Sequence, residues 1–258
     1  MIRMLAAGAL LACIAALEAT ACPAEGEPLG EGAILFHSCH EPSAADILLL
    51  PEDLAEVGQG AGGRTVTVTG AYTGKDERAP GIPAPVGLLM VDGEVIGRHA
   101  ARMDGILLLE PNRHRLGLHR IDAVPLGGEI YDLGPYDKRQ EFFRQARARG
   151  VSLLQSHLLV IHGRVDTQPV EGAPRHRRRI FFTDADGFGI WQSRSALTLN
   201  EAARAIAGDL APEMALNLDM GSFDFCLLTH ADGRHEPCGT LRREALDRLS
   251  NLLVLSRR

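Results

Sequence analysis

The stretch from residue 179 to residue 209 reads RIFFTDADGFGIWQSRSALTLNEAARAIAGD and contains both kinds of element that we expect in this protein. Apolar runs at residues 179–183 and 189–192 predict two strands, and the Asp186-Gly187 pair between them is typical of a hairpin turn. Residues 198–201, Thr-Leu-Asn-Glu, form a capping box, which predicts that an amphipathic helix begins there. A hairpin followed directly by a helix favours a mixed fold.

The same pattern of short apolar runs, separated by Gly, Pro and Asp, continues through the rest of the chain. We expect a second helix at residues 137–149, closed by Gly150, and a hairpin with Asp92-Gly93 at its tip. Further strands are expected at residues 34–37, 47–50, 65–69, 86–91, 106–109, 116–121, 152–155, 157–162, 214–219, 223–229 and 252–255. Many short strands and few helices predict an α+β fold, a single domain of mixed or antiparallel sheets with two or three flanking helices.

The composition limits the kinds of protein that this chain can be. Its 258 residues, 45% apolar and 23% charged, are typical of one large soluble domain with a hydrophobic core. The net charge of −6 argues against a nucleic-acid partner, which needs a basic surface. Aromatic residues make up 5%, so no platform for stacking bases or sugars is evident.

The first 21 residues have the order of a signal peptide. Arg3 is followed by an apolar run over residues 5–17 and then by Ala19-Thr20-Ala21, the small-x-small pattern at which signal peptidase cleaves. This run is shorter than the ~20 residues of a transmembrane helix, and no other segment qualifies as a span. We therefore expect an exported protein, periplasmic or secreted, organised as a leader (1–21), a lead-in with the first strands (22–63) and a main domain (64–256).

Removal of the leader leaves four cysteines, Cys22, Cys39, Cys226 and Cys238. The last two are equidistant from Asp232 in a predicted hairpin turn, so a paired hairpin sets them opposite each other and predicts a disulfide. The alternative is two unlinked small apolar side chains. Cys22 directly follows the cleavage site, and a lipid anchor on its sulfur is the alternative to simple cleavage. Ala19 stands where lipoprotein precursors usually have a larger aliphatic residue, which favours simple cleavage.

The candidate chemistry lies in residues 214–219, Met-Ala-Leu-Asn-Leu-Asp. Alternate residues of a strand point to opposite sides, so Met214, Leu216 and Leu218 share one face while Asn217 and Asp219 share the other. A carboxylate and an amide at the end of a strand, beside a glycine-containing loop, make a reasonable catalytic arrangement. An Asp that caps a turn explains these residues equally well when they are taken alone.

Residues 215–219, ALNLD, resemble the Asn-Leu-Asp-Gly-Gly signature of the phosphodiester glycosidases, the family of the lysosomal uncovering enzyme that removes N-acetylglucosamine from phosphomannose. Other family motifs have counterparts in the same order along the chain, at residues 69–72 (TGAY), 85–96 (PVGLLMVDGEVI), 154–163, 178–187 (RRIFFTDADG), 197–203 and 248–255 (RLSNLLVL). The resemblance covers the chain from about residue 66 to residue 255, and the ordered set is more specific than any one motif.

The resemblance implies an exported hydrolase that cleaves a sugar-phosphate phosphodiester in an envelope or environmental glycan, without an organic cofactor. It assigns catalytic roles to Asp219, Asn217 and Arg178, the last as the fork of donors that suits a phosphate. It places the substrate near Thr69, Tyr72 and Gly221. Gln155 and His157 are expected to point to one face of their strand, so both can reach a sugar hydroxyl or a phosphate. The second carboxylate that a glycosidase usually needs is either Asp224 or Asp104.

One departure from the family pattern leads to an alternative prediction of function. Where the family has two glycines after the Asp, this chain has Met220 and Gly221, and a side chain there can fill the space in which a ligand approaches the backbone. The alternative is therefore a non-catalytic module of the same fold that binds an anionic glycan, and a third interpretation is a scaffold without a concave polar pocket. Residues 37–40, His-Ser-Cys-His, lack a second Cys/His cluster at zinc spacing, so no metal site is expected.

Overall fold

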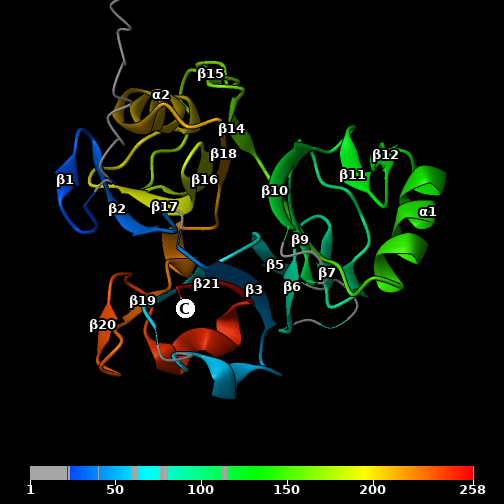
Figure 1. Ribbon diagram of the computed structural model, residues 1–258, viewed down its shortest axis with the longest axis horizontal. Helices are drawn as coiled ribbons and strands as arrows, with labels where there is room; N and C mark the ends of the chain where they lie inside the picture. The colour runs from blue at the N-terminus through cyan, green and yellow to red at the C-terminus, as the bar shows by residue number, and fades with distance from the viewer. Residues whose placement is uncertain are drawn as a thin grey trace, which may run out of the picture.

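The computed structural model describes residues 22, 24–39, 41–59, 63–75, 79, 81–111 and 115–257. The expected leader, residues 1–21, lies outside the described residues. Three antiparallel sheets and two α-helices dominate the described part of the chain (Figure 1). The α+β fold expected from the sequence is confirmed, with all three sheets contributing to one unit.

The first sheet has seven strands in the order β1-β2-β17-β16-β18-β14-β15. Its centre is the hairpin expected from the sequence, β16 (Arg179–Asp184) and β17 (Gly187–Ser193), with β18 (Met214–Asn217) beside β16. The remaining strands are β1 (Pro28–Leu29), β2 (Gly32–His37), β14 (Leu158–Ile161) and β15 (Arg164–Val165). Helix α2 (Leu199–Leu210) packs its apolar side onto this sheet, where Ile206 joins Trp191 and Phe182 in one buried cluster.

The second sheet has five strands in the order β10-β9-β13-β7-β8. They are β7 (Leu89–Val91), β8 (Glu94–Gly97), β9 (Gly105–Glu110), β10 (Arg115–Arg120) and β13 (Ser152–Ser156). Helix α1 (Tyr136–Arg147) and the ribbon of β11 (Val124–Leu126) and β12 (Glu129–Tyr131) lie beyond this sheet, on the right of Figure 1. Phe142 of α1 packs with Val124 and Ile106 in a second buried cluster.

The third sheet has the order β20-β19-β4-β21-β3. It consists of β3 (Ser43–Leu49), β4 (Thr65–Thr69), β19 (Cys226–Thr229), β20 (His235–Pro237) and β21 (Asn251–Arg257), with the 3-10 helices η1 (Leu54–Glu56) and η4 (Arg243–Arg248) nearby. A short ribbon of β5 (Thr73–Lys75) and β6 (Pro83–Pro85) follows β4. The largest buried cluster includes Phe181, Leu154 and Leu253, one from each sheet, so the three sheets enclose a common core.

Residues 22–63 supply strands to two of these sheets. β2 pairs with β17 in the first sheet, and β3 pairs with β21 along seven residue pairs in the third. A disulfide joins Cys22 to Cys39, with 6.1 Å between their Cα atoms. The same Cys22 sulfur cannot carry a lipid thioether and form this disulfide, so the structure does not support the lipid-anchor alternative.

The expected disulfide in the β19–β20 hairpin is present. The register pairs Leu227 with Pro237, which sets Cys226 opposite Cys238, and the two Cα atoms are 4.8 Å apart. Structural disulfides are typical of proteins that fold in an oxidising compartment, which agrees with an exported protein. No helix within the described ranges is long and apolar enough to cross a membrane.

Three expected strands lose two or three residues at one end, each for a local reason. The strand expected at residues 86–91 begins at Leu89, because Gly87 has φ +97° and a Cβ there would lie 2.7 Å from Gln155 Oε1. The strand expected at 214–219 ends at Asn217, since the Asp219 amide turns to the carbonyl of Gly70 near the third sheet. Residues 221–223 form a 3-10 turn, η3, so the strand expected at 223–229 begins at Cys226.

Candidate active site

The candidate site lies where the chain passes from one sheet to another. Residues 70–73 follow β4, His157 joins β13 of the second sheet to β14 of the first, and residues 218–220 run from β18 toward β19. A cavity of about 1130 Å³ opens at these crossings, and Tyr72, His157 and Arg178 are among its lining residues. Strand ends of different sheets thus bring together residues that are far apart in the sequence.

Asn217 is hydrogen-bonded to a residue of the cavity wall. Its Nδ2 donates to the Tyr72 hydroxyl at 2.6 Å and to the Leu218 carbonyl at 2.9 Å. Its Oδ1 is buried and has no hydrogen-bond partner among the described residues. Burial raises the pKa of Tyr72 to about 12, with Arg178 acting in the opposite direction, so the phenol stays neutral at physiological pH. The phenol oxygen accepts from Asn217 and also lies at the Ser156 side chain, and rotation of its O–H allows it to donate to a ligand in the cavity.

Asp219 lies behind the cavity wall. Its Oδ2 accepts from the Thr73 amide at 2.9 Å and its Oδ1 from the Met220 amide at 2.8 Å. Thr73 lines the cavity, whereas Asp219 is 4% exposed and is not a lining residue. Burial raises the pKa of Asp219 to about 6, against the opposing effect of the two amides. Asn217 and Asp219, which are expected from strand alternation to share one face, both reach the Tyr72–Thr73 segment, and neither lines the cavity.

Arg178 lines the cavity, but part of its guanidinium is already bound. Nε donates to the Leu197 carbonyl at 2.8 Å and Nη2 to the Pro174 carbonyl at 3.0 Å. No group within the described part of the chain accepts a hydrogen bond from Nη1. Burial lowers the pKa of Arg178, and Tyr72 opposes this shift. The backbone carbonyls therefore hold the side chain in place and leave Nη1 for an anion, in place of the two-donor fork expected from the sequence.

His157 completes this wall of the cavity. Its ring meets that of Tyr72 edge to face, with 6.0 Å between the ring centroids and 74° between the planes. Burial lowers the pKa of His157, Asp104 opposes the shift and Arg178 adds to it, so the imidazole is neutral at pH 7. A neutral imidazole has one donor and one acceptor nitrogen to offer a ligand.

Gln155, Thr69 and Gly221 do not line the cavity. Gln155 is fully buried, and its amide bonds the backbone of Leu88, Ala101 and Met103, so it holds the loop at 101–103 that does line the cavity. The Thr69 hydroxyl donates to the Phe223 carbonyl and accepts from the Phe225 amide at 3.1 Å. Gly221 is exposed and opens the η3 turn with φ +76°. Gln155 and Thr69 therefore support the backbone around the site, while Gly221 lies in an exposed turn.

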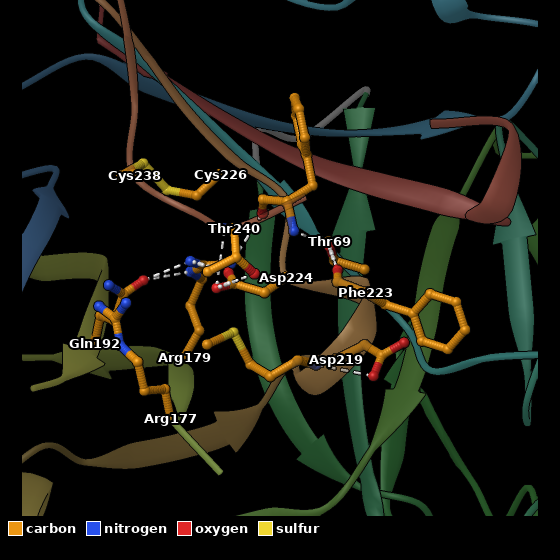
Figure 2. A network of polar contacts seen from close by, with 12 residues as sticks. Thr69, Arg177, Arg179, Gln192, Asp219, Phe223, Asp224, Cys226, Cys238 and Thr240 are labelled. Atoms are coloured by element: carbon orange, nitrogen blue, oxygen red, sulfur yellow. Dashed lines mark hydrogen bonds and ion pairs between the residues drawn. A yellow bond between two sulfur atoms is a disulfide. The ribbon is translucent and has the colours of Figure 1, made fainter. Parts of the chain in front are cut away.

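The two candidates for a second carboxylate have different surroundings. Asp224 is 3% exposed and accepts from Arg179 Nη2 at 2.8 Å and from the Thr240 amide at 3.2 Å. Figure 2 shows this network beside the Cys226–Cys238 disulfide, with Asp219 separate from it. Asp104 lines the cavity; its Oδ1 accepts from the Leu158 amide at 3.0 Å. Of the two, Asp104 is the carboxylate that a ligand in the cavity can reach.

Sequence reasoning missed two residues that shape the site. Asp166, which directly follows β15, lines the cavity near Asp104, and partial burial together with the Asp104 carboxyl raises its pKa. Asn251 Oδ1 accepts from the Ala71 amide at 2.8 Å and so fixes the backbone next to Tyr72. A Cβ on Gly70 would lie 2.4 Å from the same Asn251 oxygen, which makes glycine necessary there. Asn251 could have been found, because it is the Asn of the motif at 248–255; no signal marks Asp166.

Met220, the residue that replaces a family glycine, does not line the cavity. It is 8% exposed, and its backbone turns toward Asp219 through the hydrogen bond described above. Among the described residues, no three His, Cys, Asp or Glu side chains gather in a way that could hold a metal ion. The described lining offers an anion the guanidinium groups of Arg178 and Arg102 and the Tyr72 hydroxyl, and it also contains the carboxyl groups of Asp104 and Asp166.

Comparisons with known proteins give fold-level likenesses. No protein-family profile matches the sequence, and no curated protein matches it. Among solved structures, the chain is similar to the zebrafish N-acetylglucosamine-1-phosphodiester alpha-N-acetylglucosaminidase catalytic domain autoinhibited by its pro-peptide, at 13% identity and a TM-score of 0.48, over 88% of this chain and 75% of that one. It is also similar to a putative exported protein of Burkholderia pseudomallei (14% identity, TM-score 0.49, 83% of this chain and 71% of that one). A hypothetical protein from Synechocystis is similar at 14% identity and a TM-score of 0.42, over 84% of this chain and 57% of that one.

Proposed function

We propose that this protein is an exported hydrolase that cleaves a sugar-phosphate phosphodiester linkage at the anomeric carbon. One observation supports the proposal most: residues from separate motif positions along the sequence converge on one cavity wall. Tyr72, His157 and Arg178 line the cavity, and Asn217 and Asp219 bond directly to the Tyr72–Thr73 segment. Nothing in the local secondary structure requires these segments to meet.

The donors of this wall suit a phosphodiester. Arg178 Nη1 and the Tyr72 O–H can both donate to phosphate oxygens, and charge-assisted hydrogen bonds are stronger than neutral ones. A phosphodiester carries a single negative charge, which one guanidinium balances. The neutral imidazole of His157 adds no further charge and can donate to the same group or to a sugar hydroxyl.

The carboxylates supply the rest of the chemistry. In the proposed reaction, water adds to the anomeric carbon, the bond from that carbon to the phosphate oxygen breaks, and a phosphomonoester leaves. Asp219, with its pKa of about 6, is mostly ionised at neutral pH and places negative charge behind Tyr72, where it stabilises positive charge at the sugar. Asp104 faces the cavity directly and is placed to exchange the proton of water.

The test measures the hydrolysis of sugar 1-phosphodiesters, some with an activated leaving group and some with an ordinary alcohol. The wild type is compared with three variants. Asp219→Asn removes the charge and is expected to reduce turnover by at least ~100-fold. Arg178→Lys replaces a planar donor by a point charge and is expected mainly to raise KM. Tyr72→Phe deletes the donor hydroxyl and is expected to reduce kcat/KM. Asp247→Asn, at an exposed carboxylate on η4 that does not line the cavity, is the matched control.

The second candidate function is a binding module of the same fold. The observation in its favour is the low exposure of Asp219, whose two oxygens already accept from backbone amides. This function predicts that the wild-type protein binds sugar phosphodiesters without turnover, and that Arg178→Lys weakens the binding. Measured hydrolysis that Asp219→Asn abolishes and Asp247→Asn preserves would exclude it.

A further inference from the structure

The lining of the cavity combines groups of different chemical character. Arg178, Arg102 and Tyr72 contribute hydrogen-bond donors, and Asp104 and Asp166 contribute carboxyl groups. Aliphatic side chains supply much of the remaining lining, including Val86, Met103, Ile121, Leu158, Val170 and Leu199. A site for two sugars joined by a phosphate needs polar groups on both sides of the phosphate, whereas this cavity is aliphatic over a large part of its surface.

A flat aromatic surface for a second sugar is also missing from the described lining. Tyr72 is the single Phe, Tyr or Trp among the described residues that line the cavity. Its ring already contacts His157, and its hydroxyl is bonded to Asn217. The cavity therefore offers an apolar chain more contact than it offers a second ring with many hydroxyl groups.

Two exposed valines extend the aliphatic lining outward. Val86 is 39% exposed and Val170 is 68% exposed, and both line the cavity. Exposed aliphatic side chains grouped at a pocket are typical of a ligand-binding surface. Each one is connected to an anion donor through the backbone. The Val86 amide donates to the Tyr72 carbonyl at 2.7 Å, and Val170 lies on the loop that Arg178 holds at Pro174.

We propose that the substrate is a sugar phosphodiester whose alcohol is an aliphatic chain, in place of a second sugar. This inference rests on the proposed hydrolase function. The phosphate binds at Arg178 and Tyr72, the chain lies along Val86 and Val170, and the sugar hydroxyls donate to Asp104 and Asp166. Water replaces the phosphate oxygen on the anomeric carbon, so the products are the free sugar and an alkyl phosphate.

The experiment compares hexose 1-phosphodiesters that differ only in the alcohol: methyl, octyl and mannosyl. We expect kcat/KM for the octyl ester to exceed that for the methyl ester by at least tenfold, which corresponds to about 1.4 kcal/mol, and to exceed that for the mannosyl ester as well. Binding of the same three esters is measured by calorimetry below the concentration at which the octyl ester forms micelles. The octyl ester is expected to bind at least tenfold more tightly than the methyl ester.

Single substitutions test whether the preference for the octyl ester over the methyl ester arises in the cavity. Val170→Ser and Val86→Ser are expected to reduce the octyl-to-methyl ratio by about threefold or more each. Val165→Ser is the matched control: this valine, on β15, is 37% exposed and does not line the cavity, so the ratio should not change.

The outcomes separate this inference from the proposed function. Hydrolysis of all three esters at equal kcat/KM would overturn the aliphatic preference and leave the hydrolase function standing. Binding of the octyl ester in preference to the methyl ester, with no hydrolysis of either, would support the aliphatic cavity and contradict the hydrolase function. An octyl preference that Val165→Ser reduces as much as Val170→Ser does would mean non-specific surface binding, and the inference would be rejected.

Discussion

Burial and hydrogen bonds set the ionisation and the position of the side chains at the candidate site. Burial raises the pKa of Asp219 to about 6, although both of its oxygens accept hydrogen bonds from backbone amides. Burial also keeps the phenol of Tyr72 neutral. Arg178 is fixed by two carbonyls before any ligand arrives. Tyr72 and Arg178, which line the cavity, are therefore already fixed in position, and under the proposed function this lowers the entropy lost when a ligand binds.

The pKa of Asp219 makes a prediction about stability and pH. An Asp carboxyl ionises near its ordinary value of 3.8 in the unfolded chain and near about 6 in the folded protein. Between these values the folded protein binds more protons, so stability falls as pH rises, by up to about 3 kcal/mol for a shift of about two pH units. Asp219→Asn cannot ionise and should lack this loss.

Urea unfolding at pH 4, 5, 6 and 7 tests this. The free energy of unfolding of Asp219→Asn should gain on that of the wild type as pH rises from 4 to 7. The exposed-site control Asp247→Asn should follow the wild type throughout. Parallel curves for wild type and Asp219→Asn would mean that Asp219 ionises at its ordinary pKa in the folded protein.

At the scale of elements, helix α2 positions part of the cavity. Thr198, Leu199 and Asn200 at its start line the cavity, and Asn200 Nδ2 donates to the Thr167 carbonyl at 2.8 Å. The capping box expected from the sequence is present: the Glu201 amide donates to Thr198 Oγ1 at 3.2 Å, and the Thr198 amide donates to Glu201 Oε2 at 2.8 Å. Thr198 therefore both caps α2 and lines the cavity.

Thr198→Ala should lower the free energy of unfolding by about 1 kcal/mol, the usual effect of losing an N-cap side chain. Ser195→Ala, at an exposed position shortly before the helix, serves as the control and should change stability by less than about 0.5 kcal/mol. Chemical unfolding of both variants gives the comparison. An equal small effect for the two would show that the cap contributes little in this fold.

At the scale of the whole molecule, a buried ion pair connects two sheets. Arg179 begins β16 of the first sheet, and Asp224 lies just before β19 of the third. The Arg179 side chain is fully buried, and it donates to Asp224 at 2.8 Å, to Gln192 Oε1 at 3.0 Å and to the Phe225 carbonyl at 2.9 Å. Burial lowers the pKa of Arg179 to about 10, which still leaves it charged at neutral pH.

Asp224→Ala should destabilise the protein by about 3–5 kcal/mol, because it leaves the guanidinium buried without its counter-charge. The double variant Arg179→Met/Asp224→Leu should recover much of this loss, since two apolar side chains leave no unpaired charge. Thermal and urea unfolding of the three proteins provide the test. A single variant as stable as the wild type would show that Gln192 and the Phe225 carbonyl suffice for Arg179.

Export and disulfide formation affect the whole molecule as well. We expect the exported protein to begin at Cys22, with Cys22 linked to Cys39 and Cys226 linked to Cys238. Intact mass and non-reducing peptide mapping measure both features. A chain that still begins at Met1 would contradict the leader, a diacylglycerol increment on Cys22 would indicate lipidation, and free thiols at Cys226 and Cys238 would contradict the hairpin disulfide.

Local patterns in the sequence determined the fold class, most strands, both helices and the β19–β20 disulfide. The reason is that hydrophobic alternation, capping boxes and Asp-Gly turns act within a few residues, as the β16–β17 hairpin and α2 show. Alternation also grouped Met214, Leu216 and Leu218 in one core cluster. These features follow from local sequence alone.

The tertiary structure decided which candidate residues face the cavity. Gln155 and His157 are two residues apart, yet one is buried against the loop at 101–103 and the other lines the cavity, because the chain leaves one sheet between them and enters another. Asp166 and Asp104 meet from separate loops, and no local pattern relates them. Which loops lie side by side depends on how three sheets pack around one core, and that packing is a sum of long-range contacts that no short stretch of sequence contains.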